Sequence, residues 1–390
     1  MKTLTIQFSN IFQSILTLAF FLLMEVTTWL PLRFWAVWGG GGFIDTTQIL
    51  NYSECFSAFK FGIYDANDSD CSGYIYGRTL LVFLDFLGLG LAHSFTVGIF
   101  LLFLLSIILS YCLPVKNLKD AFFYLLIVLS PPVMLLAERG NFDILMVGLV
   151  FLAGIQLSKG RVIISALIIA SATLIKFYTG PLFLIVLVKS RGFRSKILVS
   201  MIAVSTAYVT LVDLSKMNQG FPRALGFGFE VWGEYLNQYS STTGSTLRNQ
   251  LLAVITFSVC VFLAIRLKFS GLFFPVSFVH QDNRNKLIAN LLWLSLMSSY
   301  FLGLSFDYRL IFLAISVLLF IQSQELDGSR ESYLYWMLVS ILWLSFPSSG
   351  VAPIGDLLLE LMIASASVSY FIYLRPRFSR STGRGSPKAT

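Results

Sequence analysis

Apolar runs recur along almost the whole chain, and this repetition is the feature that most constrains its fold. Hydrophobic residues make up 56% of the 390 residues and charged residues only 12%, whereas a soluble domain carries about 25% charge. A helix of about 20 apolar residues is long enough to cross a bilayer. We therefore expect an all-α, polytopic membrane protein of about 12 spans, several of them short or broken. The runs lie at about 11–30, 94–113, 121–137, 142–157, 162–176, 179–188, 197–213, 249–265, 287–305, 309–321, 332–346 and 357–374.

The distribution of Lys and Arg predicts the orientation of these spans. With a cytoplasmic N-terminus, most basic residues fall on the cytoplasmic side, and only nine of the 28 face outward. The net charge of +8 is thus explained by topology, and we expect no nucleic-acid partner. The first run lacks a small-residue cleavage site at its end, which predicts a retained helix rather than a signal peptide.

The same topology predicts one transmembrane domain over residues 1–374. Its long non-cytoplasmic loops lie at about 31–93 and 214–248, and a basic, disordered cytoplasmic tail follows at 375–390, close to anionic membrane lipid. Because the long connections are mostly on the outer side, we expect the chemistry on that side as well.

Three of the outward basic residues lie directly beside apolar runs. They are Arg139, Lys176 and Arg309. A cation inside a span costs on the order of 2.5–3.5 kcal/mol on insertion scales, so it usually faces a polar cavity or a partner. The predicted topology puts all three at the same level of the membrane, where together they could bind a phosphate or diphosphate.

A simpler interpretation is that each of these cations is paired locally or extends to the membrane surface. Arg139 is close in sequence to Glu138 and Asp143, and Arg309 is close to Asp307. The sequence alone leaves this alternative open.

The first outer loop contains a predicted interfacial helix that starts at Asp45. Apolar side chains at positions 49, 52, 56 and 59 follow at helical spacing, which predicts a helix lying on the membrane surface. Asp45 is a candidate general base at the start of this helix. Alternatively, Asp45 and Gln48 form a capping box, in which Asp45 only caps the helix.

The remaining polar residues give no metal or cofactor motif. His93 and His280 lie on opposite predicted sides, and neither a zinc spacing nor a Walker A sequence is present. Cys55 and Cys71 share the first outer loop and could form a disulfide if it faces an oxidising compartment. Cys112 and Cys260 lie in apolar runs, which is typical of buried structural cysteines.

The segment from Ala137 to Arg194, "AERGNFDILMVGLVFLAGIQLSKGRVIISALIIASATLIKFYTGPLFLIVLVKSRGFR", resembles a known family. It is similar to the polytopic GT-C glycosyltransferases of family 87, whose members include mannosyltransferases that use polyprenyl-phosphate mannose. The motif elements are E-R-G-[NQ]-x-[DN] at Glu138–Asp143, the basic loop Lys159–Arg161 and the element Lys176–Pro181. The resemblance covers about 60 residues and is weaker at Asp45 and at Phe306–Leu310.

This resemblance implies short and broken spans around a cavity that opens on the outer side. It also implies a catalytic Asp in the first outer loop, a position that Asp45 matches, and basic residues that bind the lipid phosphate. The family's mannosyltransferases also use a polar residue such as His late in the chain, and no late outer His is found here. The resemblance therefore leaves the sugar and the acceptor unassigned.

The expected function is transfer of a hexose, such as mannose, from a polyprenyl-phosphate sugar to a lipid-linked or glycan acceptor, with inversion. It takes place on the non-cytoplasmic face of a membrane, for which the resemblance suggests the bacterial cytoplasmic membrane. Asp45 is the expected base, and Arg139, Lys176 and Arg309 bind the donor phosphate without a metal or cofactor. Residues expected to orient these groups or to contact substrate are Glu138, Asn141, Asp143, Tyr178, Asp307, Glu230 and Glu234.

Three alternatives remain open. Glu230 and Glu234, with the nearby aromatic rings of Trp232 and Tyr235, could instead belong to a solvated interfacial helix. The protein could be an O-antigen-type polymerase or ligase, which uses a lipid-diphosphate donor. It could also be a secondary transporter with the broken hairpin 162–188 as its substrate site, although no internal repeat is visible.

Overall fold

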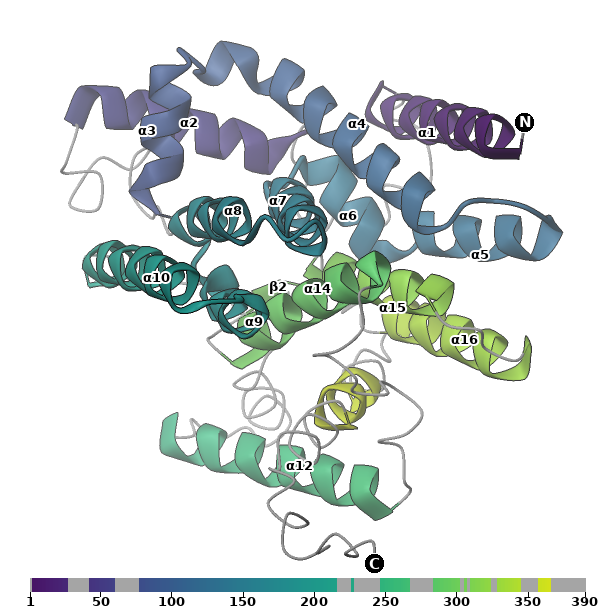
Figure 1. The fold of residues 1–390 in the computed structure, drawn as a ribbon. Helices are drawn as coiled ribbons and strands as arrows, with labels where there is room; N and C mark the ends of the chain where they lie inside the picture. The colour runs from purple at the N-terminus through teal and green to yellow at the C-terminus, as the bar shows by residue number, and fades with distance from the viewer. Residues whose placement is uncertain are drawn as a thin grey trace, which may run out of the picture.

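The computed structural model describes residues 2–26, 42–59, 77–215, 226–227, 246–266, 283–301, 305–306, 309–323, 328–344 and 357–365. Most of these residues form helices, and the described part of the chain also contains one pair of two-residue strands (Figure 1). The predicted all-α class is therefore confirmed. The predicted tail at 375–390, with Asp307, Glu230 and Glu234, lies outside the described residues.

The helix bounds agree closely with most of the apolar runs. In chain order the elements are α1 (Lys2–Val26), α2 (Ile44–Phe59), α3 (Arg78–Phe86), η3 (Leu91–His93), α4 (Ser94–Cys112), α5 (Leu118–Val128), α6 (Pro131–Arg139), α7 (Asp143–Ser158), α8 (Val162–Ile175), η4 (Phe177–Leu182), α9 (Phe183–Lys189), α10 (Phe193–Leu214), β1 (Gly226–Phe227), α12 (Thr246–Arg266), α14 (Arg284–Phe301), β2 (Ser305–Phe306), α15 (Leu310–Ser323) and α16 (Gly328–Leu344). A further helix covers residues 357–365.

The predicted apolar run at 121–137 is broken in the structure. It is divided into α5 and α6, which are bent by 58° relative to each other. The break has a local cause, because Ser130 is extended and precedes Pro131 and Pro132 at the first two positions of α6. Proline disfavours a helical residue before it and has no N–H to continue the helix, but fits the first turn of a new one.

Among the residues that the structure describes, two helical segments are long and apolar enough to cross a membrane, and the bent pair α5–α6 would make a third. They are Leu91–Cys112 and Phe193–Leu214. On the second, large apolar side chains such as Met201, Val204 and Leu211 are strongly exposed, which suits contact with lipid. The helices α7 and α8 are shorter, with 16 and 14 residues. The structure is thus compatible with a membrane protein.

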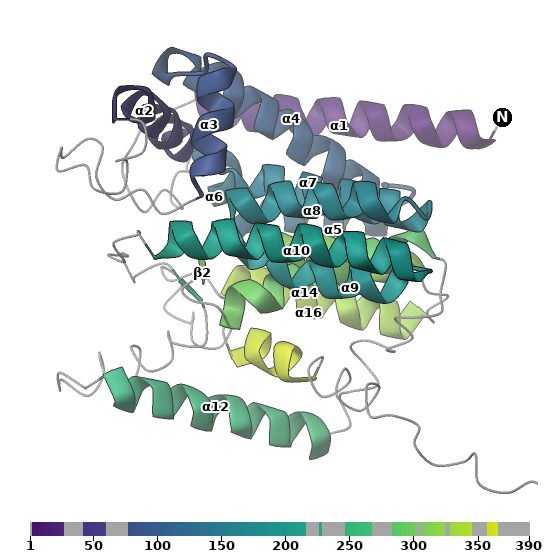
Figure 2. The ribbon, with the colours of Figure 1, turned by 60° about the vertical axis from the view of Figure 1, so that its left-hand side comes forward.

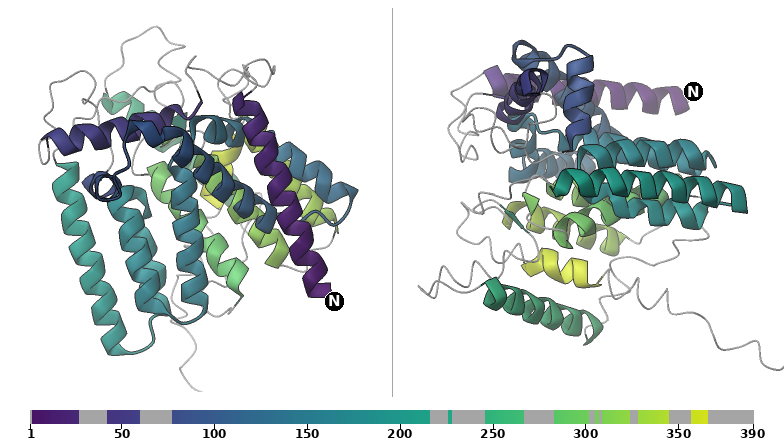
Figure 3. Two further views of the ribbon diagram at one scale, coloured as in Figure 1. Left: turned by 90° about the horizontal axis from the view of Figure 1, so that it is seen from above. Right: turned by 90° about the vertical axis from the view of Figure 1, so that its left-hand side faces the viewer.

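The α2 helix lies across the end of the main helix bundle. Figure 3 shows it roughly perpendicular to α7, α8 and α10 at one end of these helices, while the N-terminus of α1 lies at the other end. Figure 2 shows α12 on the opposite side of the molecule from α1. The predicted apolar stripe of α2 is buried within the protein at Ile49, Tyr52 and Phe56, where α2 packs on α3 and α4. These side chains are therefore not the surface with which α2 would contact lipid.

The strand pair joins two segments that are distant in sequence. Gly226 lies opposite Phe306 and Phe227 opposite Ser305 in an antiparallel arrangement. This pairing anchors the second predicted outer loop beside the residues that precede Arg309.

The cysteines follow the predicted division between loop and core. Cys55 on α2 is disulfide-bonded, and Cys112 and Cys260 are buried free thiols. Cys71, the predicted partner of Cys55, lies outside the described residues.

Candidate functional site

The start of α2 docks on the end of α6, and this contact positions Asp45. The backbone N–H of Phe43 donates a 2.8 Å hydrogen bond to the carbonyl of Glu138. One turn further on, the Thr46 hydroxyl donates to the carbonyl of Gly140 at 2.5 Å. These two bonds fix the first turn of α2 against the sequence ERGN, so that Asp45 faces Arg139.

Gly140 allows this close approach because it has a left-handed backbone (φ +55°) and no side chain. A Cβ atom there would lie 2.6 Å from the Thr46 hydroxyl oxygen and 2.8 Å from the Phe43 ring. The docking of α2 therefore requires a glycine at this position.

We predict that Gly140→Ala destabilises the protein more than Gly88→Ala does. Both glycines are left-handed, so alanine should cost about 1–2 kcal/mol at either position. Only at Gly140 would the new methyl group clash, adding about 1–3 kcal/mol, because nothing lies within 4 Å of a Cβ at Gly88. Chemical unfolding in detergent measures the difference, and equal losses would contradict the described contact between α2 and α6.

Both oxygens of the Asp45 carboxylate are hydrogen-bonded. Arg139 donates to one oxygen and forms an ion pair with it, and the Asn141 amide donates to the other at 2.5 Å. The capping-box interpretation is wrong, since α2 begins at Ile44 and Asp45 lies inside its first turn. The idea of purely local pairing is also wrong for Arg139, whose partner Asp45 is 94 residues away in sequence.

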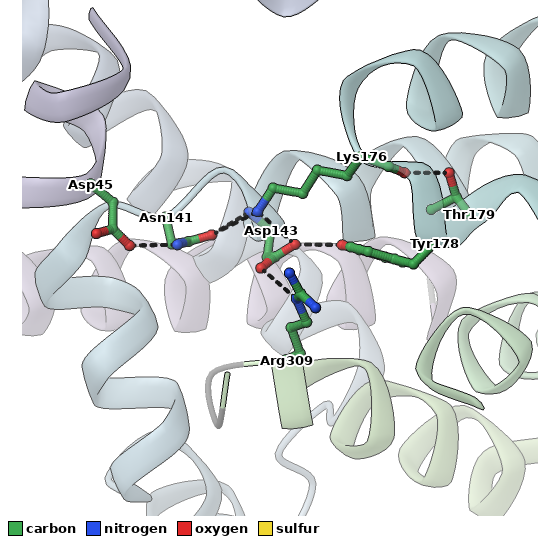
Figure 4. Close-up of polar contacts among 7 residues, drawn as sticks. All are labelled: Asp45, Asn141, Asp143, Lys176, Tyr178, Thr179 and Arg309. Carbon is green, nitrogen blue, oxygen red and sulfur yellow. Dashed lines mark hydrogen bonds and ion pairs between the residues drawn. The ribbon is translucent and has the colours of Figure 1, made fainter. Parts of the chain in front are cut away.

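Asn141 links Asp45 to a second, deeper carboxylate. Its side-chain oxygen accepts hydrogen bonds from the backbone N–H of Asp143 at 2.8 Å and from Lys176 Nζ at 3.3 Å. The same amide thus contacts the Asp45 carboxylate, the start of α7 and the end of α8 (Figure 4).

Asp143 is the fully buried centre of this group. Its carboxylate lies 2.9 Å from Lys176 Nζ and 3.5 Å from Arg309 Nε, and it accepts a hydrogen bond from the Tyr178 hydroxyl (Figure 4). The Arg309 guanidinium also lies over the Tyr178 ring, 4.8 Å from its centroid. One carboxylate therefore joins α7, the turn between α8 and η4, and the start of α15.

The turn that carries Lys176 has its own support. Lys176 leaves the end of α8 with an extended backbone, and its carbonyl accepts a 3.2 Å hydrogen bond from the Thr179 hydroxyl. Beside it, the Gly77 N–H donates to the Ile175 carbonyl at 3.2 Å, and Arg78 pairs with Asp213 at 2.7 Å. These contacts attach α3 and α10 to the side of the site.

Side-chain exposure divides the cluster into a deep and a shallow part. The Asp143 and Lys176 side chains are 0% and 2% exposed. The Arg139 side chain is 22% exposed and that of Arg309 is 13% exposed. Arg139 and Arg309 are consequently the cations that a ligand can reach most easily. The Asp45 side chain, 9% exposed, lies just behind Arg139, and Lys176 is held deeper by Asp143.

The cluster has an excess of positive charge. It brings together three cations, Arg139, Lys176 and Arg309, with the two carboxylates of Asp45 and Asp143, which leaves a formal charge of +1. Such a site attracts an anion, and the arginine guanidinium suits the geometry of a phosphate oxygen pair. Within the described residues, no group of three His, Cys, Asp or Glu side chains is arranged to bind a metal.

Of the predicted orienting residues, the structure brings Asn141, Asp143 and Tyr178 into the cluster, but the residues that dock α2 and support the Lys176 turn were not predicted. Phe43, Thr46 and Gly140 dock α2, and Thr179 supports the Lys176 turn. The only sequence signal was the glycine of ERGN, which is typical of a helix end but does not identify its partner. Asp307, Glu230 and Glu234 were predicted to contribute and lie outside the described residues.

The fold and the cluster define a helical protein, compatible with a membrane, that has a partly buried, positively charged site at one end of its bundle. Comparison with known proteins adds no relative, since no family model, no curated protein and no solved structure matches the chain.

Proposed function

We propose that this protein is a membrane glycosyltransferase that transfers a hexose from a polyprenyl-phosphate sugar to a lipid-linked or glycan acceptor. The observation that carries the proposal is the contact of the Asp45 carboxylate with Arg139 and Asn141, beside Lys176 and Arg309, which pair with Asp143 at the same end of the bundle. A transferase of this kind needs both a base for the acceptor and cations for the departing phosphate. The same proposal includes an arrangement of about 12 spans like that of the GT-C enzymes that the sequence resembles.

The donor phosphate is proposed to bind to Arg139 and Arg309. These are the partly exposed cations of the cluster, and their guanidinium groups can each donate two hydrogen bonds to phosphate oxygens. Lys176 contributes positive charge from behind, where the low polarity of its surroundings strengthens its field. The polyprenyl chain would then extend from the site along the apolar helices into the bilayer.

The proposed reaction is a single displacement with inversion. Asp45 removes the proton from the acceptor hydroxyl, and the hydroxyl oxygen attacks the anomeric carbon as the bond from that carbon to the phosphate oxygen breaks. The bonding electrons leave with the phosphate, whose growing charge is stabilised by Arg139 and Arg309. The transferred proton remains on Asp45 until it is exchanged with water. A carboxylate accepts up to about four hydrogen bonds, so Asp45 can contact the acceptor while retaining its partners.

Asp143 is proposed to position the site rather than to react. It is buried, and it orients Lys176, Arg309 and Tyr178, which come from two separate parts of the chain. Preorganised charges of this kind stabilise a transition state without having to rearrange during the reaction.

The site is proposed to face the non-cytoplasmic side of a bacterial cytoplasmic membrane. The disulfide at Cys55 supports this orientation, because disulfides persist in oxidising compartments. The distribution of basic residues also favours it, since the end of the bundle opposite to α2 carries the cluster Lys189, Arg191, Arg194 and Lys196.

The direct test is to offer the purified protein, in lipid vesicles, a set of sugar donors with a panel of lipid-linked acceptors. We expect transfer from a polyprenyl-phosphate hexose and none from a nucleotide sugar. Transfer only from a lipid-diphosphate oligosaccharide would instead identify a polymerase or ligase. Uptake of a solute without transfer of any sugar would identify a transporter.

We further predict that Arg309→Gln weakens binding of the polyprenyl-phosphate donor roughly 10- to 100-fold, the loss expected for a hydrogen bond to a charged group. Arg194→Gln is the matched control, since Arg194 is exposed at the first turn of α10, at the opposite end of the bundle. Titration with a fluorescent polyprenyl phosphate in detergent measures both affinities. Equal affinities of the two variants would exclude Arg309 from the phosphate site.

A further inference from the structure

A charged cavity lies between the ends of four helices, away from the Asp45 site, and has no part in the proposed reaction. Its volume is about 620 Å³, and it is found where α7 turns into α8 and where α9 turns into α10, beside the start of α14. The lining residues used below are Arg161, Lys189, Arg191, Ile163 and Ile164.

This cavity is at the other end of the bundle from the Asp45 site. The α7 helix begins at Asp143 and ends beside the cavity at Ser158, so its 16 residues separate the two places by about 24 Å of helix rise. Figure 3 shows the ends of α8 and α10 that lie away from α2 on the side where the N-terminus is also found. One phosphate cannot contact both sites.

The lining of the cavity is basic, and the surrounding sequence contains no acid. Arg161, Lys189 and Arg191 contribute three cations. Between Asp143 and Asp213 the sequence contains neither Asp nor Glu. Arg161 donates to the neutral side chain of Gln156 at 3.5 Å. The local potential is therefore positive, and no carboxylate of the segment between Asp143 and Asp213 repels an anion that enters the cavity.

Apolar surface continues from the cavity along the outside of the helices. Ile163 and Ile164 line the cavity and are both about half exposed, and Leu167 is exposed one turn further along α8. On the neighbouring α9, Leu184 and Val188 are exposed as well. Cations at the helix ends thus adjoin an exposed apolar face, which matches the division of a phospholipid into an anionic headgroup and acyl chains.

We propose that this cavity binds an anionic phospholipid. Its phosphate contacts Arg161, Lys189 and Arg191, and its acyl chains lie along the exposed faces of α8 and α9. A lipid is favoured over free phosphate because the cavity joins apolar surface that a soluble anion would leave uncovered. The inference does not depend on the proposed glycosyltransferase activity.

The test compares lipid binding by two variants that lose the same charge. The first replaces the three lining cations (Arg161→Gln, Lys189→Gln and Arg191→Gln), and the second replaces three neighbouring cations that do not line the cavity (Lys159→Gln, Arg194→Gln and Lys196→Gln). Native mass spectrometry measures how much phosphatidylglycerol each protein retains relative to phosphatidylcholine. We expect the lining variant to lose affinity about 100-fold, because each cation near an anionic lipid contributes roughly a factor of five. The second variant should resemble wild type.

Equal losses in the two variants would overturn the proposal, since they would indicate nonspecific attraction to a basic surface. If the lining variant does not fold, the proposal is tested on the wild-type protein by thermal unfolding. Phosphatidylglycerol should then raise its midpoint of thermal unfolding in mixed micelles of detergent and phosphatidylcholine, whereas inorganic phosphate at the same concentration should not. Equal shifts with inorganic phosphate, or no shift with the lipid, would contradict a phospholipid site.

Discussion

Asparagine in place of Asp45 is expected to slow sugar transfer by about 10²- to 10⁴-fold, the range that a general base contributes. Asn has nearly the same shape and can still accept a hydrogen bond from Arg139 or from Asn141, although not from both, and it cannot accept the proton of the acceptor hydroxyl. The loss should appear in kcat, with donor affinity little changed, because the donor phosphate is assigned to the arginines. Single-turnover transfer at saturating donor measures the chemical step.

Asp85→Asn is the matched control for this experiment. Asp85 is an exposed acid at the end of α3 that accepts a hydrogen bond from Ser57, and it lies outside the charged cluster. Its variant should transfer sugar at the wild-type rate. If Asp45→Asn does the same, Asp45 is not the base.

A double variant separates catalysis by Asp45 from simple charge pairing. Asp45→Asn leaves Arg139 without the carboxylate to which it is now paired, and this alone could disturb the site. Asp45→Asn with Arg139→Gln removes both charges together. We expect the double variant to be slower still, because Arg139 is also assigned to the donor phosphate, whereas recovery of activity would assign Asp45 a structural role and exclude Arg139 from the phosphate site.

The helices could be predicted well because hydropathy locates the apolar segments, and in a membrane such a segment becomes helical to satisfy its own backbone hydrogen bonds. The run at 197–213 became α10, at 193–214, and the run at 162–176 became α8, at 162–175. The break between α5 and α6 was also visible in the sequence as Ser130 followed by two prolines. A window that averages hydrophobicity hides such a break, because proline interrupts the helix without making the segment polar.

The sequence predicted which charged residues belong to the candidate site, but not which cation pairs with which carboxylate. Positive-inside reasoning singled out Arg139, Lys176 and Arg309 as exceptions, and the structure brings all three together. The partner of Arg139 was sought nearby in the sequence, yet it is Asp45 on another helix. The pairing of Arg139 with Asp45 depends on how α2 docks through Phe43, Thr46 and Gly140, and this tertiary contact cannot be predicted from a local sequence pattern.

Asparagine in place of Asp143 is expected to cause the largest loss of stability, about 3–5 kcal/mol, which is typical of removing one member of a buried ion pair. The Asp143 side chain is fully buried between Lys176 and Arg309, and the Lys176 side chain is only 2% exposed. Without the carboxylate, two cations face each other in a place that water hardly reaches. The free energy of unfolding in detergent, measured by denaturant titration, should fall by this amount.

The loss should be larger than for Asp213→Asn, the matched control. Asp213 is also buried, but its partner Arg78 is 20% exposed and can be hydrated when the carboxylate is removed.

A second variant tests more directly whether the loss of stability is caused by uncompensated charge. Adding Lys176→Met to Asp143→Asn removes one of the two uncompensated charges, so the double variant should be more stable than Asp143→Asn alone. If the two losses simply add, the cost comes from packing rather than from charge, because independent sites are additive and coupled ones are not.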